Sequence, residues 1–243
     1  MALYLHVRIT VKADQVAAFI KAARKFLETR FLPKQKWELI AAFQATGANY
    51  FGDLAERSNA AREKHPLEVT FINVWRMSDI VDLSEIMLEL SEFGPYIDLD
   101  ARVTDESQDV ALRVIDSDSN GDAELIKKVK AARCCAMVRH YVDRANLAEF
   151  VVNFGALVPS WEHGLVYCGT YQNVTGLLNE FWDVWIVEPA LDLAAFRAKL
   201  SALVVAGGKD AVTQAFRHSI DFDKDGPDDG IVMVEPAEYW TKP

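Results

Sequence analysis

The feature that most constrains the fold of this 243-residue chain is an internal repeat. Residues 5–19, LHVRITVKADQVAAF, resemble residues 136–150, AMVRHYVDRANLAEF. Further short matches follow in the same order: Phe43–Gly47 with Tyr171–Gly176, Asn73–Trp75 with Asp183–Trp185, Asp82-Leu83 with Asp192-Leu193, and Ile97–Asp100 with Ile220–Asp223. Chance similarity does not keep its order along a chain, so the sequence predicts a tandem duplication.

Each copy is predicted to contain the same order of strands and helices. Apolar residues at strand or helix spacing define the segments, and Asp14 and Asp79 are expected to cap the helices of the first copy. The first copy gives strands at 3–11, 37–45, 68–76 and within 97–114, and helices at 15–31 and 80–93. The second gives strands at 134–142, 165–173, 180–187 and 230–236, and helices at 146–162, 191–206 and 209–217.

The order β-α-β-β-α-β is typical of a ferredoxin-like unit, so the predicted fold class is α+β. The predicted repeats cover residues 1–115 and 133–243, and a polar linker at 116–132 joins them. A ferredoxin-like sheet carries its helices on one face, and its other face needs a cover. Two copies in one chain can pack these faces together. We therefore expect an intramolecular α+β barrel, a monomeric pseudo-dimer that could associate further through its helices.

The charge of the chain excludes some classes of partner. Lys and Arg number 26 against 36 Asp and Glu, for a net charge of −10. This balance argues against nucleic acid and against anionic membrane surfaces as partners. No signal-peptide pattern or apolar run long enough to span a bilayer is present, which favours a cytoplasmic location. The three cysteines, Cys134, Cys135 and Cys168, fit neither a disulfide framework nor a zinc site, so no metal is expected.

The segments Phe71–Asp79 and Phe181–Glu188, each with a Trp late in the third strand of its copy, resemble the dimeric α+β barrel superfamily. This group includes antibiotic-biosynthesis-monooxygenase-like and NIPSNAP-like proteins. Its activities include cofactor-free oxygenation of aromatic polyketides, cyclisation, isomerisation and haem chemistry. The resemblance implies a pocket between sheet and helices, lined by Trp75 in the first copy and by Trp185 in the second.

Strand periodicity adds polar residues to these two pockets. Phe71, Asn73 and Trp75 should share one face of their strand, and Phe181, Asp183 and Trp185 the matching face in the second copy. A polar residue beside a Trp on a buried face could bind a ligand or an acid–base partner. The alternative is that both Trp side chains are core packing and that Asn73 and Asp183 are satisfied locally.

The second copy is predicted to hold the more reactive pocket. It has Asp183 where the first has Asn73, and His140 where the first has Ile9. We expect His140, Asp183 and Trp185 to be catalytic. Substrate-binding residues are expected to be Asn73, Trp75, Phe71, Tyr167, Tyr171 and Phe181. An Asp near a His can fix its tautomer, which favours general-base chemistry. The alternative is that His140 packs in the core and Asp183 pairs with an Arg.

Two arginines at matching positions, Arg8 and Arg139, are expected to point into the barrel interface. Buried guanidinium groups need carboxylate partners, and the recurring IDxD segments offer Asp98, Asp100, Asp221 and Asp223. Pairing between the two copies is the first interpretation of these arginines. Binding of an anion or substrate is the second.

Together these observations favour a small-molecule enzyme of the monooxygenase-like or cyclase-like kind, acting on an apolar aromatic or polyketide-like compound. No cofactor is implied, because no dinucleotide or phosphate-loop motif occurs. One alternative is a non-catalytic ligand-binding or NIPSNAP-like interaction protein. Another is a haem-binding barrel, which would use a histidine such as His140 or His163 as axial ligand.

Overall fold

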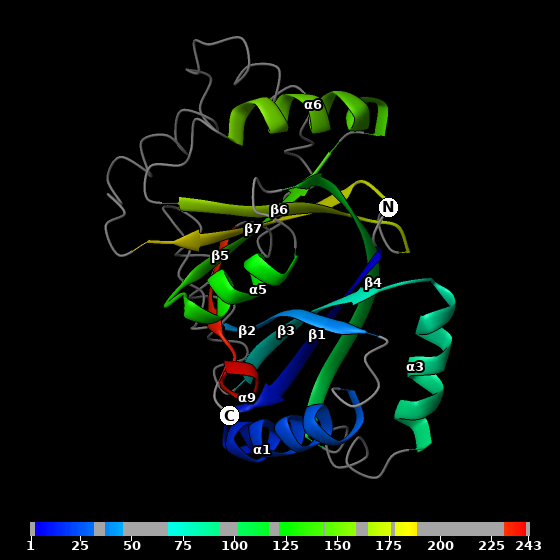
Figure 1. Ribbon diagram of the computed structural model, residues 1–243, viewed down its shortest axis with the longest axis vertical. Helices are drawn as coiled ribbons and strands as arrows, with labels where there is room; N and C mark the ends of the chain where they lie inside the picture. The colour runs from blue at the N-terminus through cyan, green and yellow to red at the C-terminus, as the bar shows by residue number, and fades with distance from the viewer. Residues whose placement is uncertain are drawn as a thin grey trace.

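Eight antiparallel strands close into a barrel in the computed structural model (Figure 1). The structure describes residues 3–31, 37–45, 68–92, 102–116, 122–142, 144–158, 165–175, 178–188 and 231–241. The strands are β1 (Leu3–Lys12), β2 (Glu38–Ala45), β3 (Glu68–Met77), β4 (Val103–Asp116), β5 (Cys135–Tyr141), β6 (Leu165–Asn173), β7 (Glu180–Val187) and β8 (Ile231–Pro236). The predicted strands are therefore confirmed, with ends that differ by a residue or two.

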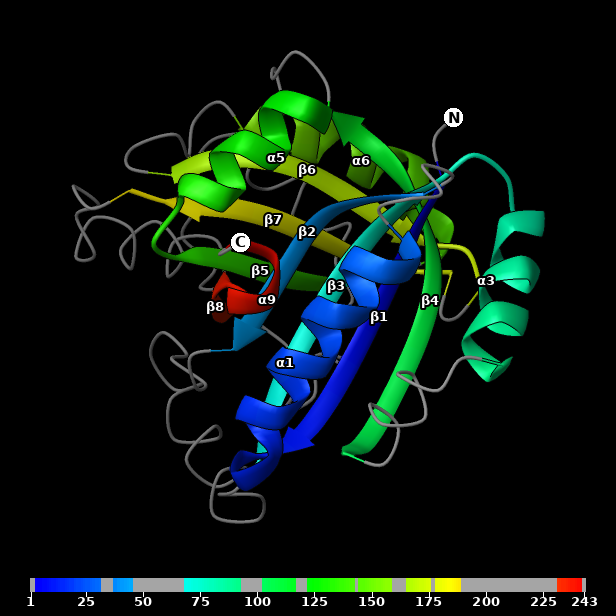
Figure 2. The ribbon, with the colours of Figure 1, turned by 60° about the horizontal axis from the view of Figure 1, so that its bottom comes forward.

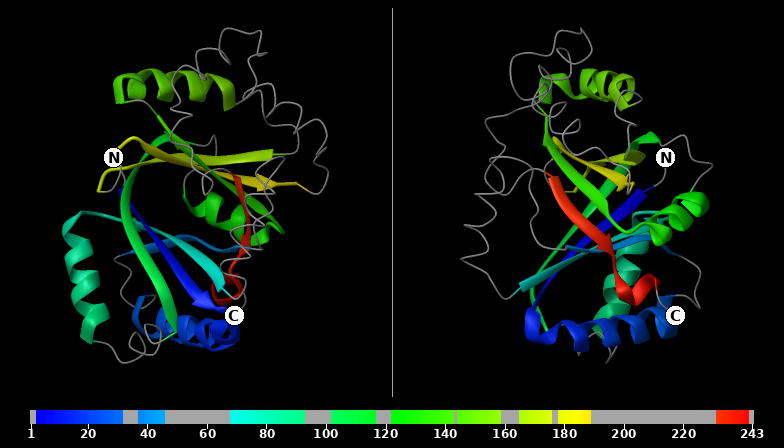
Figure 3. Two further views of the ribbon diagram at one scale, coloured as in Figure 1. Left: turned by 180° about the vertical axis from the view of Figure 1, so that it is seen from behind. Right: turned by 90° about the vertical axis from the view of Figure 1, so that its left-hand side faces the viewer.

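The order of strands around the barrel is the same in the two halves of the chain. It runs β4-β1-β3-β2 in the first half and continues as β8-β5-β7-β6 in the second. The halves meet where β2 pairs with β8 and where β4 pairs with β6. Figure 3 shows β8, near the C-terminus, running beside the first half of the barrel. One chain thus supplies every strand of the closed barrel.

Helices cover the outside of the barrel. Figure 1 shows α1 (Val16–Phe26) and α6 (Leu147–Leu157) on opposite sides of it, with α3 (Val81–Glu92) at one flank. A short helix, α9 (Glu238–Thr241), lies beside α1 (Figure 2). The helices predicted at 191–206 and 209–217 lie outside the described residues. In the part of the chain that the structure describes, no helix is long and apolar enough to cross a bilayer.

The predicted caps differ in outcome. Asp79 does cap its helix, because its Oδ1 accepts a hydrogen bond from the backbone N–H of Val81 at 3.1 Å. The prediction for Asp14 is wrong. The chain leaves β1 through a 3₁₀ turn at Ala13–Gln15, so Asp14 lies inside that turn and the N-cap of α1 is Gln15.

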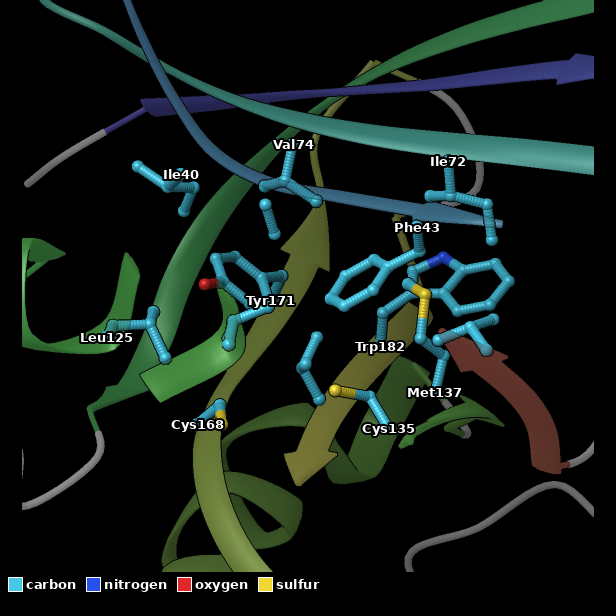
Figure 4. Close-up of a cluster of buried hydrophobic side chains, with 14 of the residues drawn as sticks. Ile40, Phe43, Ile72, Val74, Leu125, Cys135, Met137, Cys168, Tyr171 and Trp182 are labelled. Atoms are coloured by element: carbon cyan, nitrogen blue, oxygen red, sulfur yellow. The ribbon is translucent and has the colours of Figure 1, made fainter. Parts of the chain in front are cut away.

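Much of the barrel interior is a packed core (Figure 4). Inward-facing side chains such as Tyr4, Phe43 and Met137 are at most 2 % exposed. Their neighbours along each strand point outward to the helices, which explains why β1, β3 and β7 bury both faces. The predicted linker at 116–132 contains a further helix, α5 (Asp122–Ala131), which was not predicted. Its Leu125 and Val129 join the interior cluster.

Ionic contacts hold α5 against the first half of the barrel. The Asp122 carboxylate pairs with Arg113 and, at 3.1 Å, with Arg76, and it accepts a hydrogen bond from the Tyr4 hydroxyl. The Arg113 guanidinium lies 4.6 Å from the centre of the Tyr4 ring. The Asp122 side chain is only 8 % exposed, so these partners offset the cost of burying its charge.

Candidate functional site

Two aromatic patches lie between the barrel and its outer helices, as strand periodicity predicts. In the first half, Phe71 and Trp75 pack with Phe19 of α1. In the second half, Phe181 and Trp185 belong to a cluster with two phenylalanines of α6. The backbone register matches as well, because Asn73 faces Val7 across the strands as Asp183 faces Val138. Each polar residue therefore lies at the same place on its half of the barrel.

His140 lies on the helix-facing side of β5, among aromatic rings. Its ring centre is 5.8 Å from that of Phe150 and 5.5 Å from that of Phe154. Phe150 in turn lies 4.6 Å from Phe181, and Trp185 lies 4.9 Å from Tyr167. The His140 side chain is 13 % exposed, so this imidazole is largely removed from water.

A chain of hydrogen bonds links His140 to three side chains of β6 and β7. Its Nε2 is hydrogen bonded to the Oδ2 of Asp183. The Thr170 hydroxyl donates to the Oδ1 of Asp183 at 2.7 Å. The Tyr167 hydroxyl lies 2.6 Å from the Thr170 oxygen, and it donates there because the Thr170 proton is already given to Asp183. Both oxygens of Asp183, whose side chain is 1 % exposed, are thus occupied.

A bulge in β6 makes this chain possible. The register between β6 and β7 shifts between Tyr167 and Gly169, and Gly169 has a φ of 137° that side chains rarely tolerate. The extra residue lets both Tyr167 and Thr170 point towards the helices. The predicted grouping of Tyr171 with Tyr167 as substrate-binding residues is wrong, because the two side chains lie in different clusters. After the bulge Tyr171 points into the barrel, where its ring contacts those of Tyr4 and His6.

The first half has a different polar contact at the matching place. The Oδ1 of Asn73 accepts a hydrogen bond from the hydroxyl of Tyr239, which comes from α9 near the C-terminus. The Tyr239 ring packs against Phe19 and Phe71. Burial raises the pKa of the Tyr239 hydroxyl, so it stays protonated as a donor. This pair therefore acts as a neutral hydrogen bond inside a core.

The structure brings most of the predicted site residues together, in two groups. His140, Asp183, Trp185, Tyr167 and Phe181 form one group, with Thr170 as a member that sequence reasoning missed. Asn73, Trp75 and Phe71 form the other, with Tyr239 as the missed member. The only sequence signal for Thr170 is Gly169 within a strand, a common mark of a bulge. His163 lies outside the described residues.

The second-half group can hold and move a proton. Asp183 fixes the orientation of the imidazole through Nε2, as carboxylates do for histidines that act as bases. Thr170 and Tyr167 hold Asp183 in turn. The surrounding rings keep water away and offer flat apolar surfaces. In the first half, neither Asn73 nor Tyr239 supplies a base of this kind.

Comparison with known proteins identifies the fold. No protein-family model matches the chain, and no curated sequence matches it significantly. A proposed monooxygenase from Lactobacillus acidophilus matches at a TM-score of 0.51 and 9 % identity, over 96 % of this chain and 92 % of that one. A proposed monooxygenase from Fusobacterium nucleatum matches at a TM-score of 0.52 and 14 % identity, over 97 % of this chain and 91 % of that one. An anthrone oxidase-like protein matches at a TM-score of 0.54 and 10 % identity, over 96 % of this chain and 91 % of that one. These similarities confirm the α+β barrel fold.

Proposed function

We propose that this chain is a small-molecule enzyme whose site is the helix-facing aromatic cluster of its second half, with His140 as general base. The observation that carries the proposal is the buried hydrogen-bond chain from His140 through Asp183 and Thr170 to Tyr167. A carboxylate that is 1 % exposed and paired with an imidazole is costly to maintain for packing alone. Its placement among aromatic rings favours a role in chemistry on an apolar molecule.

The substrate that fits these surroundings is a small aromatic or polyketide-like compound with an acidic C–H or O–H group. Phe181, Trp185 and Tyr167 provide its flat walls. Asp183 orients His140, and Thr170 and Tyr167 orient Asp183. The first-half residues Phe71, Asn73 and Trp75 form the matching cluster, which we infer to support the fold, since it lacks a base.

The reaction we infer is oxygenation of an activated methylene. His140 takes a proton from the CH₂ carbon, and the resulting carbanion adds O₂ to give, after protonation, a hydroperoxide. The hydroperoxide loses water as the second C–H proton leaves, so that CH₂ and O₂ become C=O and H₂O. The substrate carbon supplies all the electrons that reduce O₂. The names of the structural neighbours, two proposed monooxygenases and an anthrone oxidase-like protein, lend this class support. A cyclisation would use the same base, with a carbonyl carbon in place of O₂.

We also infer that the two halves arose by tandem duplication, each as a ferredoxin-like unit, so that one chain forms a pseudo-dimer. The repeated strand order and the matching registers of Asn73 with Val7 and of Asp183 with Val138 support this. Expression of residues 1–115 alone should give a homodimer or an aggregating half. A stable monomer from that segment would contradict the inference.

The experiment is oxygen uptake with anthrone as the probe, with anthraquinone measured by absorbance. Wild-type protein is expected to speed uptake above the buffer rate, and His140→Gln and Asp183→Asn to lower the rate by about 10²–10⁴-fold. Glu149→Gln, on the exposed side of α6, is the matched control and should keep the wild-type rate. Equal rates for wild type and both site variants would overturn the assignment of the base. Saturable binding of anthrone without turnover would favour a ligand-binding protein instead.

A further inference from the structure

A cavity of about 270 Å³ lies inside the barrel, on the strand faces opposite to the site described above. On β5, Arg139 and Tyr141 line it, whereas His140 between them points outward to α6. Trp182 of β7 and Arg8 of β1 also line it. Figure 4 shows Trp182 beside Met137 within the barrel, away from Leu125 of α5. The cavity thus shares strands with the proposed catalytic site but none of its side chains.

The two arginines of the cavity both contact the Trp182 ring. The guanidinium carbon of Arg8 lies 5.3 Å from the ring centre and that of Arg139 lies 5.2 Å from it. The prediction that these arginines point into the barrel is confirmed. The carboxylates predicted as partners, at residues 98, 100, 221 and 223, lie outside the described residues. The carboxylates that line the cavity are instead Glu180 and Asp109.

The arginines differ in their partners. Arg139 forms an ion pair with Glu180 at 3.6 Å, and its guanidinium also lies 5.3 Å from the Tyr141 ring. Within the described residues, Arg8 forms no ion pair and lies only within the longer-range field of Glu180 and Asp109. Burial lowers the pKa of Arg8, and the charge of Arg139 lowers it further. Among the described residues, Arg8 is therefore a cation of the cavity wall with no carboxylate at contact distance.

A buried imidazole adds an unsatisfied polar group to the cavity wall. His6 is 8 % exposed and lines the cavity, and its Nε2 has no hydrogen-bond partner in the part of the chain that the structure describes. Burial, together with the charge of Arg8, lowers the pKa of His6 to about 4. The ring is therefore neutral at pH 7 and can donate one N–H without adding charge. A ligand that accepts hydrogen bonds would satisfy both His6 and Arg8.

We propose that this cavity is a second binding site, which takes a small organic monocarboxylate with a single apolar ring. The carboxylate would pair with Arg8 and accept from His6, and the ring would lie against Trp182. Glu180 and Asp109 in the same wall disfavour a dianion, because they would repel its second charge. The volume of the cavity is close to about 300 Å³, which is the lower end of the range for ligand sites. This volume limits the occupant to about one ring.

Benzoate is the probe, and isothermal titration calorimetry is the measurement. Wild-type protein should bind benzoate, and should bind the neutral isostere benzamide and the dianion phthalate at least about tenfold more weakly. Arg8→Gln should weaken benzoate binding by a similar factor. Arg133→Gln removes an exposed charge before β5 and should leave the affinity unchanged. His140→Gln should also leave it unchanged, which separates this site from the proposed catalytic one.

Several results would overturn the proposal. These are benzamide binding as tightly as benzoate, Arg8→Gln binding as tightly as wild type, and inorganic phosphate binding more tightly than benzoate. Phenylalanine binding more tightly than 3-phenylpropionate would identify a zwitterion site instead. If Arg8→Gln does not fold, Arg8→Lys takes its place. That variant keeps the charge but loses the planar donor pair, so it should weaken benzoate binding severalfold, and an unchanged affinity would contradict the role of Arg8.

Discussion

The Nε2 of His140 is hydrogen bonded to the Oδ2 of Asp183, whereas the matching positions in the first half of the barrel hold Ile9 and Asn73. The same backbone thus supports an ionisable pair on one side and an apolar residue beside a neutral amide on the other. This difference between equivalent positions is the basis for assigning the chemistry to the second half.

Removal of the Asp183 carboxylate should destabilise the protein more than the matching change in the first half. Asp183→Ala leaves Thr170 and His140 without their buried partner, at an expected cost of about 3 kcal/mol. Asn73→Ala removes a single neutral hydrogen bond to Tyr239 and should cost about 1–2 kcal/mol. Urea unfolding of both variants measures the difference. Equal costs would mean that the Asp183 charge is not held by its partners.

The tautomer of His140 follows from its hydrogen bond. When the ring is neutral, Nε2 should carry the proton and donate it to Asp183, and Nδ1 should be the unprotonated nitrogen. The ¹⁵N chemical shifts of the imidazole distinguish the two nitrogens directly. In Asp183→Asn the preference should weaken, because an amide can accept from Nε2–H or donate to it. A spectrum with the proton on Nδ1 in the wild type would contradict the proposed direction of proton transfer.

The stability of the fold should depend on pH through His6. Its pKa is about 4 in the folded protein and 6.5 in the unfolded chain, so the unfolded state binds more protons between these values. The free energy of unfolding should therefore fall as the pH drops, by about 2 kcal/mol from pH 7 to pH 5 for this group alone.

Comparison of wild type with His6→Gln isolates that contribution. Burial raises the pKa of Glu180, which works in the opposite direction, but this group is present in both proteins. Urea unfolding at the two pH values should show a steeper loss for wild type than for the variant. Parallel pH profiles would show that His6 is already solvated in the folded state.

The bulge at Gly169 should be intolerant of a side chain. A Cβ there meets the Ile115 carbonyl oxygen at 3.5 Å, an ordinary contact, so the expected cost of Gly169→Ala comes from the φ of 137°. That strain should destabilise the protein by about 1–2 kcal/mol and lower turnover by turning Thr170 away from Asp183. Gly155→Ala in α6 meets nothing within 4 Å and should instead stabilise by about 0.5–1 kcal/mol. Thermal unfolding of the two variants tests the contrast.

The sequence predicted the strands and the two helix-facing patches because both depend on local periodicity. The proximity of His140 to Asp183 could be predicted because strand periodicity places both residues on the helix-facing side of the sheet. The error at Tyr171 arose because a bulge changes the face of every later residue, and a bulge is a property of pairing between strands. Tyr239 reaches Asn73 because β8 pairs with β2 of the other half of the barrel, and no local pattern encodes this pairing.

Proton abstraction by His140 is tested most directly by deuterium exchange at the acidic CH₂ carbon of anthrone, followed by NMR in deuterated buffer without oxygen. This measures proton abstraction apart from any later step. Wild-type protein should speed the exchange above the buffer rate, His140→Gln should return it to that rate, and Glu149→Gln should leave it fast. Exchange that is as fast in His140→Gln as in wild type would contradict the role of His140 as the base.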